Sequence, residues 1–309
     1  MPSRALLAVV TLLLFLLWSN SFVAMSWVLG SEHAPARLDW VGLTSARYLP
    51  VTLSASLYLL LFRREQTSKV LRTHFVRGLI AGLLAVPTYS FALYWGIAQG
   101  IPAPIASLLT ALSPLYLLIL GALFLGEPLT RWKVGGFAVS FVGLILVAAA
   151  RGGLTLQGLA PVAIAATAPL SWALQTALSK PISRQVPADV WTATYLVLGG
   201  VPLLLGLPWL GGEQVLALDL SGWAAVSYLS FGCTILGFAL WSWLLVHVPA
   251  SSLGFTVFLN PPLALLSQLA LSRLFPGSFV FALRPGELAG CAVVLVGLGV
   301  ALRRPKLVA

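Results

Sequence analysis

Apolar residues run along this chain in long, nearly unbroken segments that are separated by short polar stretches. A helix needs about 20 such residues to cross a bilayer. Segments of this kind are predicted at residues 5–29, 38–62, 75–98, 102–125, 131–150, 158–179, 188–210, 220–246, 249–275 and 285–302. Strands of a membrane barrel would instead appear as segments of roughly ten residues with alternating polarity. The pattern therefore predicts an all-α integral membrane fold of ten transmembrane helices, with no soluble domain left over.

Composition supports the same class and excludes others. Hydrophobic residues make up 59% of the chain and charged residues only 8%, so a soluble domain of this composition would expose large apolar patches. The net charge of +10 lies in short loops rather than on a basic face, so membrane lipid is the expected partner and nucleic acid is not. With the N-terminus inside, the predicted loops place 13 Lys and Arg residues on the cytoplasmic side against four opposite. Both termini are therefore expected to be cytoplasmic.

The chain reads as two copies of one unit. A shift of 147 positions lays Phe91-Ala92-Leu93 on Phe238-Ala239-Leu240 and Pro114 on Pro261. A shift of 154 lays Gly136 and Gly143 on Gly290 and Gly297, and Trp18 on Trp172. Each copy holds five predicted helices, an odd number, so the second copy must enter the membrane from the opposite side. This predicts two inverted halves, residues 1–151 and 152–309, as in many secondary transporters.

Prolines interrupt equivalent helices of the two halves. Pro114 lies within the fourth predicted span, and Pro261 and Pro262 lie within the ninth. Proline removes an intrahelical hydrogen bond, and the freed carbonyl must face protein or water because lipid offers no donor. Interrupted helices at matching positions are typical of a binding site near the bilayer midplane, so these prolines are candidate hinges. The alternative is a plain kink that packing accommodates.

Polar and aromatic side chains gather around these interruptions, and uncharged groups of this kind suit a small-molecule cavity. The candidate substrate-binding residues are Trp18, Asn20, Arg47, Tyr94, Ser107, Thr110, Trp172, Gln175, Trp241, Thr256 and Asn260. For a single Ser or Thr, a hydrogen bond between helices is a competing role. For Trp and Tyr near span ends, the competing role is the interfacial belt.

Charge within the spans is scarce. Arg47 lies inside the second predicted span, where it would either attract a substrate carboxylate or phosphate or bind backbone carbonyls and nearby polar groups. All eight acidic residues fall in predicted loops or at helix ends, and Glu127 is expected to stabilise the start of the fifth span, near Arg131. Proton coupling through a buried carboxylate is therefore not expected. The sequence also gives no reason to expect a metal or a cofactor.

The run Ala106 to Pro114, followed by Leu125-Gly126-Glu127-Pro128-Leu129-Thr130 and then Gly136 to Val147, resembles the end of the EamA-type unit of the drug/metabolite transporter superfamily. Trp18-Ser19-Asn20 and Arg47 fit the same unit. The resemblance covers nearly the whole chain, twice. It implies ten helices in an inverted five-plus-five repeat, a central cavity, and transport of small metabolites such as amino acids, typically in a bacterial inner membrane. The second copy departs from the pattern at Ser272 and Arg273, where the unit has Gly-Glu.

The leading hypothesis is thus a secondary transporter that moves a small metabolite by alternating access, with export favoured over uptake. A channel and a non-transporting membrane protein are the alternatives. An enzyme is not expected, because the chain has no HExxH or GxSxG motif and only three histidines. A homodimer stays an open possibility.

Overall fold

The computed structural model describes residues 2–30, 36–99, 101, 106, 109–150, 159–206, 212–274 and 283–303. Within these ranges every regular element is a helix. Eight helical segments are long and apolar enough to cross a membrane, and two shorter apolar helices, Ser113–Phe124 and Pro285–Ala301, accompany them. The predicted all-α class is therefore confirmed. The count of ten spans stays a prediction, because the fourth and tenth predicted spans coincide with the two shorter helices.

The first half of the chain contains seven of the described elements. They are α1 (Arg4–Leu29), α2 (Trp40–Phe62), α3 (Arg64–Leu83), η1 (Leu84–Thr88), α4 (Tyr89–Ala98), α6 (Ser113–Phe124) and α7 (Arg131–Ala150). The third predicted span differs most from expectation, since the helix begins at Arg64 rather than at residue 75. It kinks at His74, where φ is −131°, close to the point where the apolar run begins. The preceding turns are helical although polar, and Lys69 pairs there with Glu65.

The second half contains the remaining elements. They are α8 (Leu159–Ala165), α9 (Thr167–Ile182), α10 (Ala188–Gly206), α11 (Gly212–Leu216), α12 (Leu220–Ser227), η3 (Tyr228–Leu236), α13 (Gly237–His247), α14 (Ala250–Phe255), η4 (Thr256–Leu259), α15 (Asn260–Leu274) and α16 (Pro285–Ala301). Two of these helix starts and two of the first half have side-chain caps or capping boxes, so local sequence fixes where they begin. Asp39 accepts from the Gly42 amide at 2.6 Å, and Asp219 accepts from the Gly222 amide at 2.7 Å.

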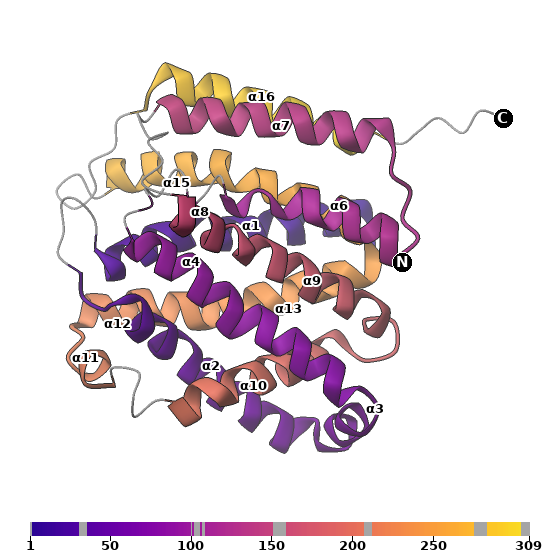
Figure 1. The fold of residues 1–309 in the computed structure, drawn as a ribbon, viewed down its shortest axis with the longest axis vertical. Coiled ribbons are helices and arrows are strands. Elements are labelled where there is room, and N and C mark those ends of the chain that lie inside the picture. Colours follow the sequence, from indigo (N-terminus) through magenta and orange to yellow (C-terminus); the bar gives the residue numbers. More distant parts are fainter. Residues whose placement is uncertain are drawn as a thin grey trace.

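Helices α7 and α16 lie side by side along one edge of the bundle, magenta and yellow in Figure 1. Glycines allow the close approach: a Cβ added at Gly143 would lie 2.6 Å from the Val294 amide nitrogen, and one at Gly290 would lie 2.8 Å from the Gly143 carbonyl oxygen. The two helices are therefore closely packed at these glycines. Gly82 of α3 and Gly199 of α10 likewise allow backbone contact between their helices.

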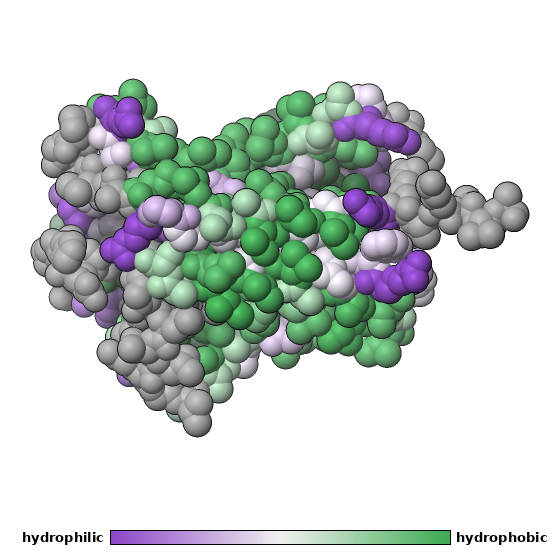
Figure 2. Space-filling model, turned by 90° about the horizontal axis from the view of Figure 1, so that it is seen from above, coloured by the Kyte–Doolittle hydropathy of each residue, from purple (hydrophilic) through white to green (hydrophobic). Residues whose placement is uncertain are grey.

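The helices lie roughly alongside one another, and the start of α1 and the end of α16 are at the same end of the bundle, at the right of Figure 1. Figure 2 shows a face on which apolar residues cover the middle, while hydrophilic residues gather toward the two ends. Large apolar side chains are exposed on this bundle; Leu60 and Leu205, for example, are 65% and 72% exposed. An apolar band bounded by polar ends is what a bilayer requires.

Candidate functional site

A cavity of about 80 Å³ lies between the two halves of the chain. One water molecule occupies roughly 10–15 Å³ on this measure, so the space accommodates several waters or a small solute. Five of the residues predicted from the sequence line it: Trp18, Arg47, Thr110, Trp172 and Asn260. They come from α1, α2, α9, α15 and the part of the fourth span that precedes α6. Among the described residues, the lining contains one cationic side chain and no carboxylate.

Nine further lining residues were not predicted from the sequence: Ser21, Phe22, Met25, Tyr48, Tyr89, Leu93, Ser113, Phe238 and Val257. A signal existed for some of them. Tyr48 follows Arg47 and is repeated as Tyr195 under the shift of 147 positions, and Ser113 precedes the interrupting Pro114. The apolar members carried no such signal, because an apolar residue within a span is the ordinary case.

Arg47 is held inside the protein, with only 6% of its surface exposed. Its Nε donates to Thr234 Oγ1 at 2.9 Å, and its Nη1 donates to the Tyr94 hydroxyl at 2.5 Å. The guanidinium also lies 5.3 Å from the centre of the Tyr48 ring. The described hydrogen bonds of Arg47 thus go to nearby polar side chains, as the second sequence alternative predicted. Arg47 also lines the cavity, and its attraction of a substrate anion stays a prediction.

The π-helical segment η3 provides two of the groups that position this wall. It presents the Thr234 hydroxyl to Arg47 and the Cys233 carbonyl to the Trp18 indole nitrogen, at 2.9 Å in both contacts. Ser230, one turn earlier, donates to the Arg47 carbonyl at 2.8 Å. A π-helical turn in the equivalent third span, η1, contains Pro87 and directly precedes Tyr89. Such turns are frequent at functional sites, and neither was expected from the sequence.

Four aromatic side chains, Trp18, Trp172, Phe238 and Trp241, form a cluster at one end of the cavity. Trp172 lies 5.4 Å from Trp18, 4.9 Å from Phe238 and 5.5 Å from Trp241, measured between ring centroids. These spacings are those of favourable edge-to-face and tilted pairs. Trp241 is itself only 1% exposed and stands behind the cavity surface, as Tyr94 does behind Arg47. Both predicted aromatic residues therefore support the wall rather than form it.

The prolines occupy the first turns of helices that follow a break. The fourth span turns at residues 111–112, and α6 then begins at Ser113 with Pro114 as its second residue. The ninth span tightens into the 3₁₀ turn η4 before α15 begins at Asn260, with Pro261 and Pro262 next. A first turn tolerates proline because its amides lack intrahelical partners. The Thr110 carbonyl, which Pro114 frees, accepts from the Ser113 hydroxyl at 2.7 Å.

Besides Tyr94 and Trp241, three further predicted residues lie outside the cavity lining. The Asn20 amide donates to Ser267 of α15 at 3.1 Å and so joins two helices. Gln175 is buried against Ser179, 3.0 Å away, and the Thr256 hydroxyl donates to the Leu253 carbonyl of its own helix at 2.5 Å. Of these contacts only that of Asn20 joins two helices, whereas those of Gln175 and Thr256 lie within their own spans. The remaining predicted residue, Ser107, lies outside the described residues.

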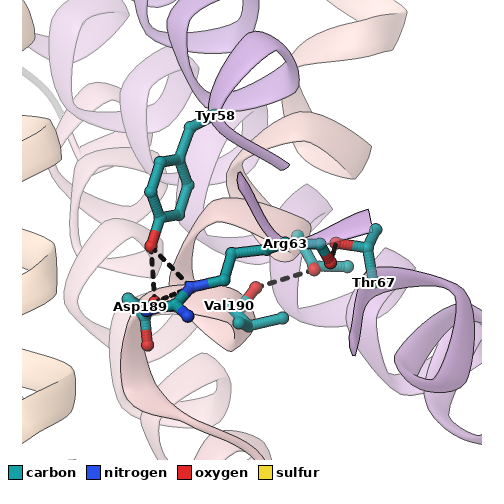
Figure 3. A network of polar contacts seen from close by, with 6 residues as sticks. Tyr58, Arg63, Thr67, Asp189 and Val190 are labelled. Carbon is teal, nitrogen blue, oxygen red and sulfur yellow. Dashed lines mark hydrogen bonds and ion pairs between the residues drawn. The ribbon is translucent and has the colours of Figure 1, made fainter. Parts of the chain in front are cut away.

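Polar contacts connect the two halves at the end of the bundle where α1 begins. Arg63 Nε lies 2.9 Å from Asp189 Oδ2, and the Tyr58 hydroxyl donates to the same oxygen at 2.5 Å, so the end of α2 is tied to the start of α10 (Figure 3). Hydrogen bonds with Tyr58 and the nearby Asp189 charge raise the pKa of Arg63, which therefore stays ionised.

Glu127 also connects the halves, which corrects the role expected for it at the start of the fifth span. Its carboxylate accepts from the amides of Ala250, at 2.6 Å, and Ser251, at 2.9 Å, at the start of α14. The Ser251 hydroxyl also donates to this carboxylate, and Lys133 donates to the same hydroxyl at 2.8 Å. A carboxylate is favoured there because the first amides of a helix lack partners.

Comparison with known proteins agrees with this architecture. The model of the EamA-like transporter family matches residues 5–149 and again residues 159–302. A crystal structure of a protein that is 22% identical shares the fold with a TM-score of 0.68, over 97% of this chain and 98% of the other.

Two named relatives are transporters. The chain is 27% identical over 303 residues to a probable amino-acid metabolite efflux pump of Salmonella typhimurium, covering 93% of this chain and 91% of the pump. It is 28% identical over 186 residues to a probable terminal-alkyne amino-acid exporter of Streptantibioticus cattleyicolor, covering 60% of this chain and 61% of the exporter. The chain therefore belongs to the EamA-like transporter family, and it is an integral, multi-pass membrane protein.

Proposed function

We propose that this protein is a secondary transporter that exports a small metabolite, an amino acid or a related compound, by alternating access. In this proposal ten helices form two inverted halves, residues 1–151 and 152–309, in a bacterial inner membrane with both termini cytoplasmic. The single observation that carries the proposal is the cavity between the halves, which is lined by Arg47 and by uncharged polar and aromatic groups. The names of the efflux pump and the exporter support the substrate class and the direction.

Contacts between α7 and α16 support the inverted repeat. Gly143 approaches the Gly290 carbonyl, and their repeat partners Gly297 and Gly136 approach each other in the same way. Exchanging each residue for its partner 154 positions away thus converts one contact into the other. A twofold axis between the halves has this property. Trp18 and Trp172, another pair of repeat partners, also touch.

The distribution of closed contacts supports alternating access. Trp18, Trp172 and Phe238 of the aromatic cluster line the cavity, and Tyr58, Arg63 and Asp189 tie α2 to α10. The residues of α1 that line the cavity come from Trp18 onward, toward the end of the bundle opposite to this network. In the proposed cycle this form is closed to the cytoplasm, and the polar network must open before the cavity can receive a cytoplasmic substrate.

The helix breaks before Pro114 and before Pro261 and Pro262 are the proposed hinges of that motion. Each break separates two helical pieces of one span, and Thr110 and Asn260 line the cavity beside the breaks. Short non-helical segments absorb backbone rotation at lower cost than the interior of a helix.

Counterflow in proteoliposomes tests the proposed function. Purified protein is reconstituted with a panel of unlabelled amino acids inside, and uptake of the labelled compound is followed with and without a pH gradient. Exchange that depends on internal substrate supports a carrier, whereas a scaffold gives none and a channel gives no trans-stimulation.

Crosslinking tests alternating access. Tyr58→Cys and Asp189→Cys, in a background with Cys233 and Cys291 replaced by alanine, are joined by a short cleavable thiol reagent. Counterflow should stop on crosslinking and return on cleavage. The matched control is Glu65→Cys with Lys69→Cys, which lie one turn apart on α3 and constrain nothing between the halves. Unimpaired transport by the crosslinked Tyr58 and Asp189 pair would rule out motion at this end.

A further inference from the structure

We infer that the substrate binds through a carboxylate to Arg47, that a neutral donor on the substrate meets Asn260, and that an ammonium group on the substrate is dispensable. This inference rests on the proposed function and names the substrate class of the same cavity. The class is a small organic monocarboxylate with an apolar body and a neutral hydroxyl or amide donor.

Arg47 has donors to spare for a ligand. A guanidinium has five N–H donors in a planar fork that matches a carboxylate. Within the described residues its side chain makes two hydrogen bonds, to Thr234 and Tyr94. These two bonds fix the orientation of the fork, and the rest of its donors are left for the substrate. A charge buried to this extent is costly until an opposite charge meets it.

No described acidic residue supplies the negative charge that would compensate Arg47. Six of the eight acidic residues have described partners elsewhere: Asp39, Glu65, Glu127, Asp189, Asp219 and Glu287. Of the other two, Glu32 lies between the first and second predicted spans, and Glu213 lies in the short helix α11 between the seventh and eighth predicted spans. The residues 102–105 and 107–108, which precede Thr110, contain no acid. The charge that compensates Arg47 must therefore come with the substrate.

The lack of a described carboxylate in the lining also argues against a substrate that carries only a positive charge. An amine would place a second positive charge beside Arg47, with no described carboxylate in the lining to offset it. The faces of Trp18 and Trp172 attract a cation only modestly, so a zwitterion is tolerated but an isolated amine is not. A carboxylate without an ammonium group neutralises the cavity fully and is expected to bind at least as well.

Asn260 gives a second, independent indication. Its Oδ1 is buried at the cavity and has no hydrogen-bond partner in the described part of the chain. A buried acceptor without a donor is unfavourable, so a ligand that donates there gains affinity. A neutral hydroxyl supplies this bond without adding charge. The apolar body of the ligand then faces Phe22, Leu93 and Val257.

A series of analogues with the same branched apolar body tests the inference on the wild-type protein. The series is 2-hydroxy-4-methylpentanoate, 4-methylpentanoate, leucine, 4-methylpentanamide and isopentylamine, with binding followed by tryptophan fluorescence in detergent. The hydroxy acid should bind at least as tightly as leucine and more tightly than 4-methylpentanoate, and isopentylamine should not bind. Binding of isopentylamine as tight as that of leucine, or no binding of any carboxylate to folded protein, would overturn the inference.

Variants locate the carboxylate. Arg47→Gln should weaken carboxylate binding roughly 10- to 100-fold, as loss of a charged hydrogen-bonding partner does. Arg37→Gln removes an arginine that pairs with Asp219 outside the cavity, and it should leave the dissociation constants unchanged. If Arg47→Gln fails to fold, Tyr94→Phe replaces it. This variant frees one end of the fork, so it should weaken the carboxylates and leave 4-methylpentanamide unaffected. Equal carboxylate affinities in wild type and folded variant would overturn the inference.

Counterflow separates this inference from the proposed function. If wild-type protein exchanges amino acids but Arg47→Gln transports them with unchanged KM, the carrier stands and the carboxylate site is wrong. If carboxylates bind in an Arg47-dependent manner but no compound is exchanged, the site stands and the transport proposal is wrong.

Discussion

Trp18 and Trp172 meet edge to face with their ring centroids 5.4 Å apart, although 154 positions separate them in the chain. They are repeat partners, yet their surroundings differ. Trp18 Nε1 donates to the Cys233 carbonyl at 2.9 Å, and Trp172 makes no hydrogen bond through its indole within the described residues. Substitutions at these two positions can therefore distinguish the contribution of ring packing to stability from that of the indole hydrogen bond.

Replacing each tryptophan by phenylalanine should destabilise the protein unequally. Trp18→Phe leaves the Cys233 carbonyl in η3 without its donor, which costs about 1–3 kcal/mol beyond the lost packing. Trp172→Phe loses packing alone and is the matched control. Thermal unfolding in detergent compares them. Equal losses would mean that the indole hydrogen bond contributes nothing.

Glycine packing between α7 and α16 predicts a position-specific effect on stability. Gly143→Ala places a Cβ 2.6 Å from the Val294 amide nitrogen, so the helices must separate and the unfolding temperature should fall. Gly135→Ala on the same helix is the control, because a Cβ there meets nothing within 4 Å. The control should be neutral or stabilised by up to about 1 kcal/mol, as alanine favours a helix over glycine. If both variants behave alike, this close approach is not stabilising.

The contacts of Glu127 with α14 predict that this residue stabilises the protein by linking the start of the fifth span to the ninth span. Glu127→Gln removes the charge that accepts the Ala250 and Ser251 amides, so the unfolding free energy should fall by about 1–2 kcal/mol. Glu65→Gln, which breaks an exposed pair with Lys69, should have no measurable effect. Unfolding in a denaturing detergent measures both. A greater loss in the Glu65 variant would contradict the assigned role.

The two asparagines near the ninth span should respond in opposite ways. Asn260→Ala removes a buried acceptor that has no described partner, so substrate affinity should fall about 5- to 10-fold while stability is retained or improved. Asn20→Ala breaks the bond to Ser267 outside the cavity, so stability should fall by about 0.5–1.5 kcal/mol while affinity is retained. Binding isotherms and melting curves on the same preparations distinguish the effects. Loss of affinity in the Asn20 variant would place that residue in the site.

The lowered pKa of Asp219 predicts that the stability of the first turn of α12 depends on pH. The Gly222 amide, the Ser221 hydroxyl and Arg37 lower the pKa of Asp219, so its capping contribution is present at neutral pH. It is lost as pH falls below about 4, through the lowered folded-state pKa. Asp219→Asn retains a good cap but cannot titrate. After correction for the intrinsic pH dependence of amide exchange, the protection of the amides at the start of α12 should therefore fall with acid more steeply in the wild type than in the variant.

The sequence by itself determined the apolar segments, the helical class, the repeated unit and the family. These properties depend on short stretches of the sequence. A run of about 20 apolar residues has one favourable structure in a bilayer, and the repeat partners align residue by residue. The charge of Arg47 and the breaks at Pro114 and Pro261 were predictable for the same reason. Each is unusual within its own span.

Only the tertiary structure decided which polar residues meet in the cavity. Asn20 and Asn260 look alike in the sequence, yet one joins two helices and the other lines the cavity. The π-helical turn η3 brings Cys233 and Thr234 to Trp18 and Arg47 across 215 and 187 positions, and Glu127 reaches Ser251 across 124. Helical periodicity determines which residues share a face, but the neighbour of that face depends on packing between distant segments. That packing is set by the whole bundle, because interior side chains must fill space together.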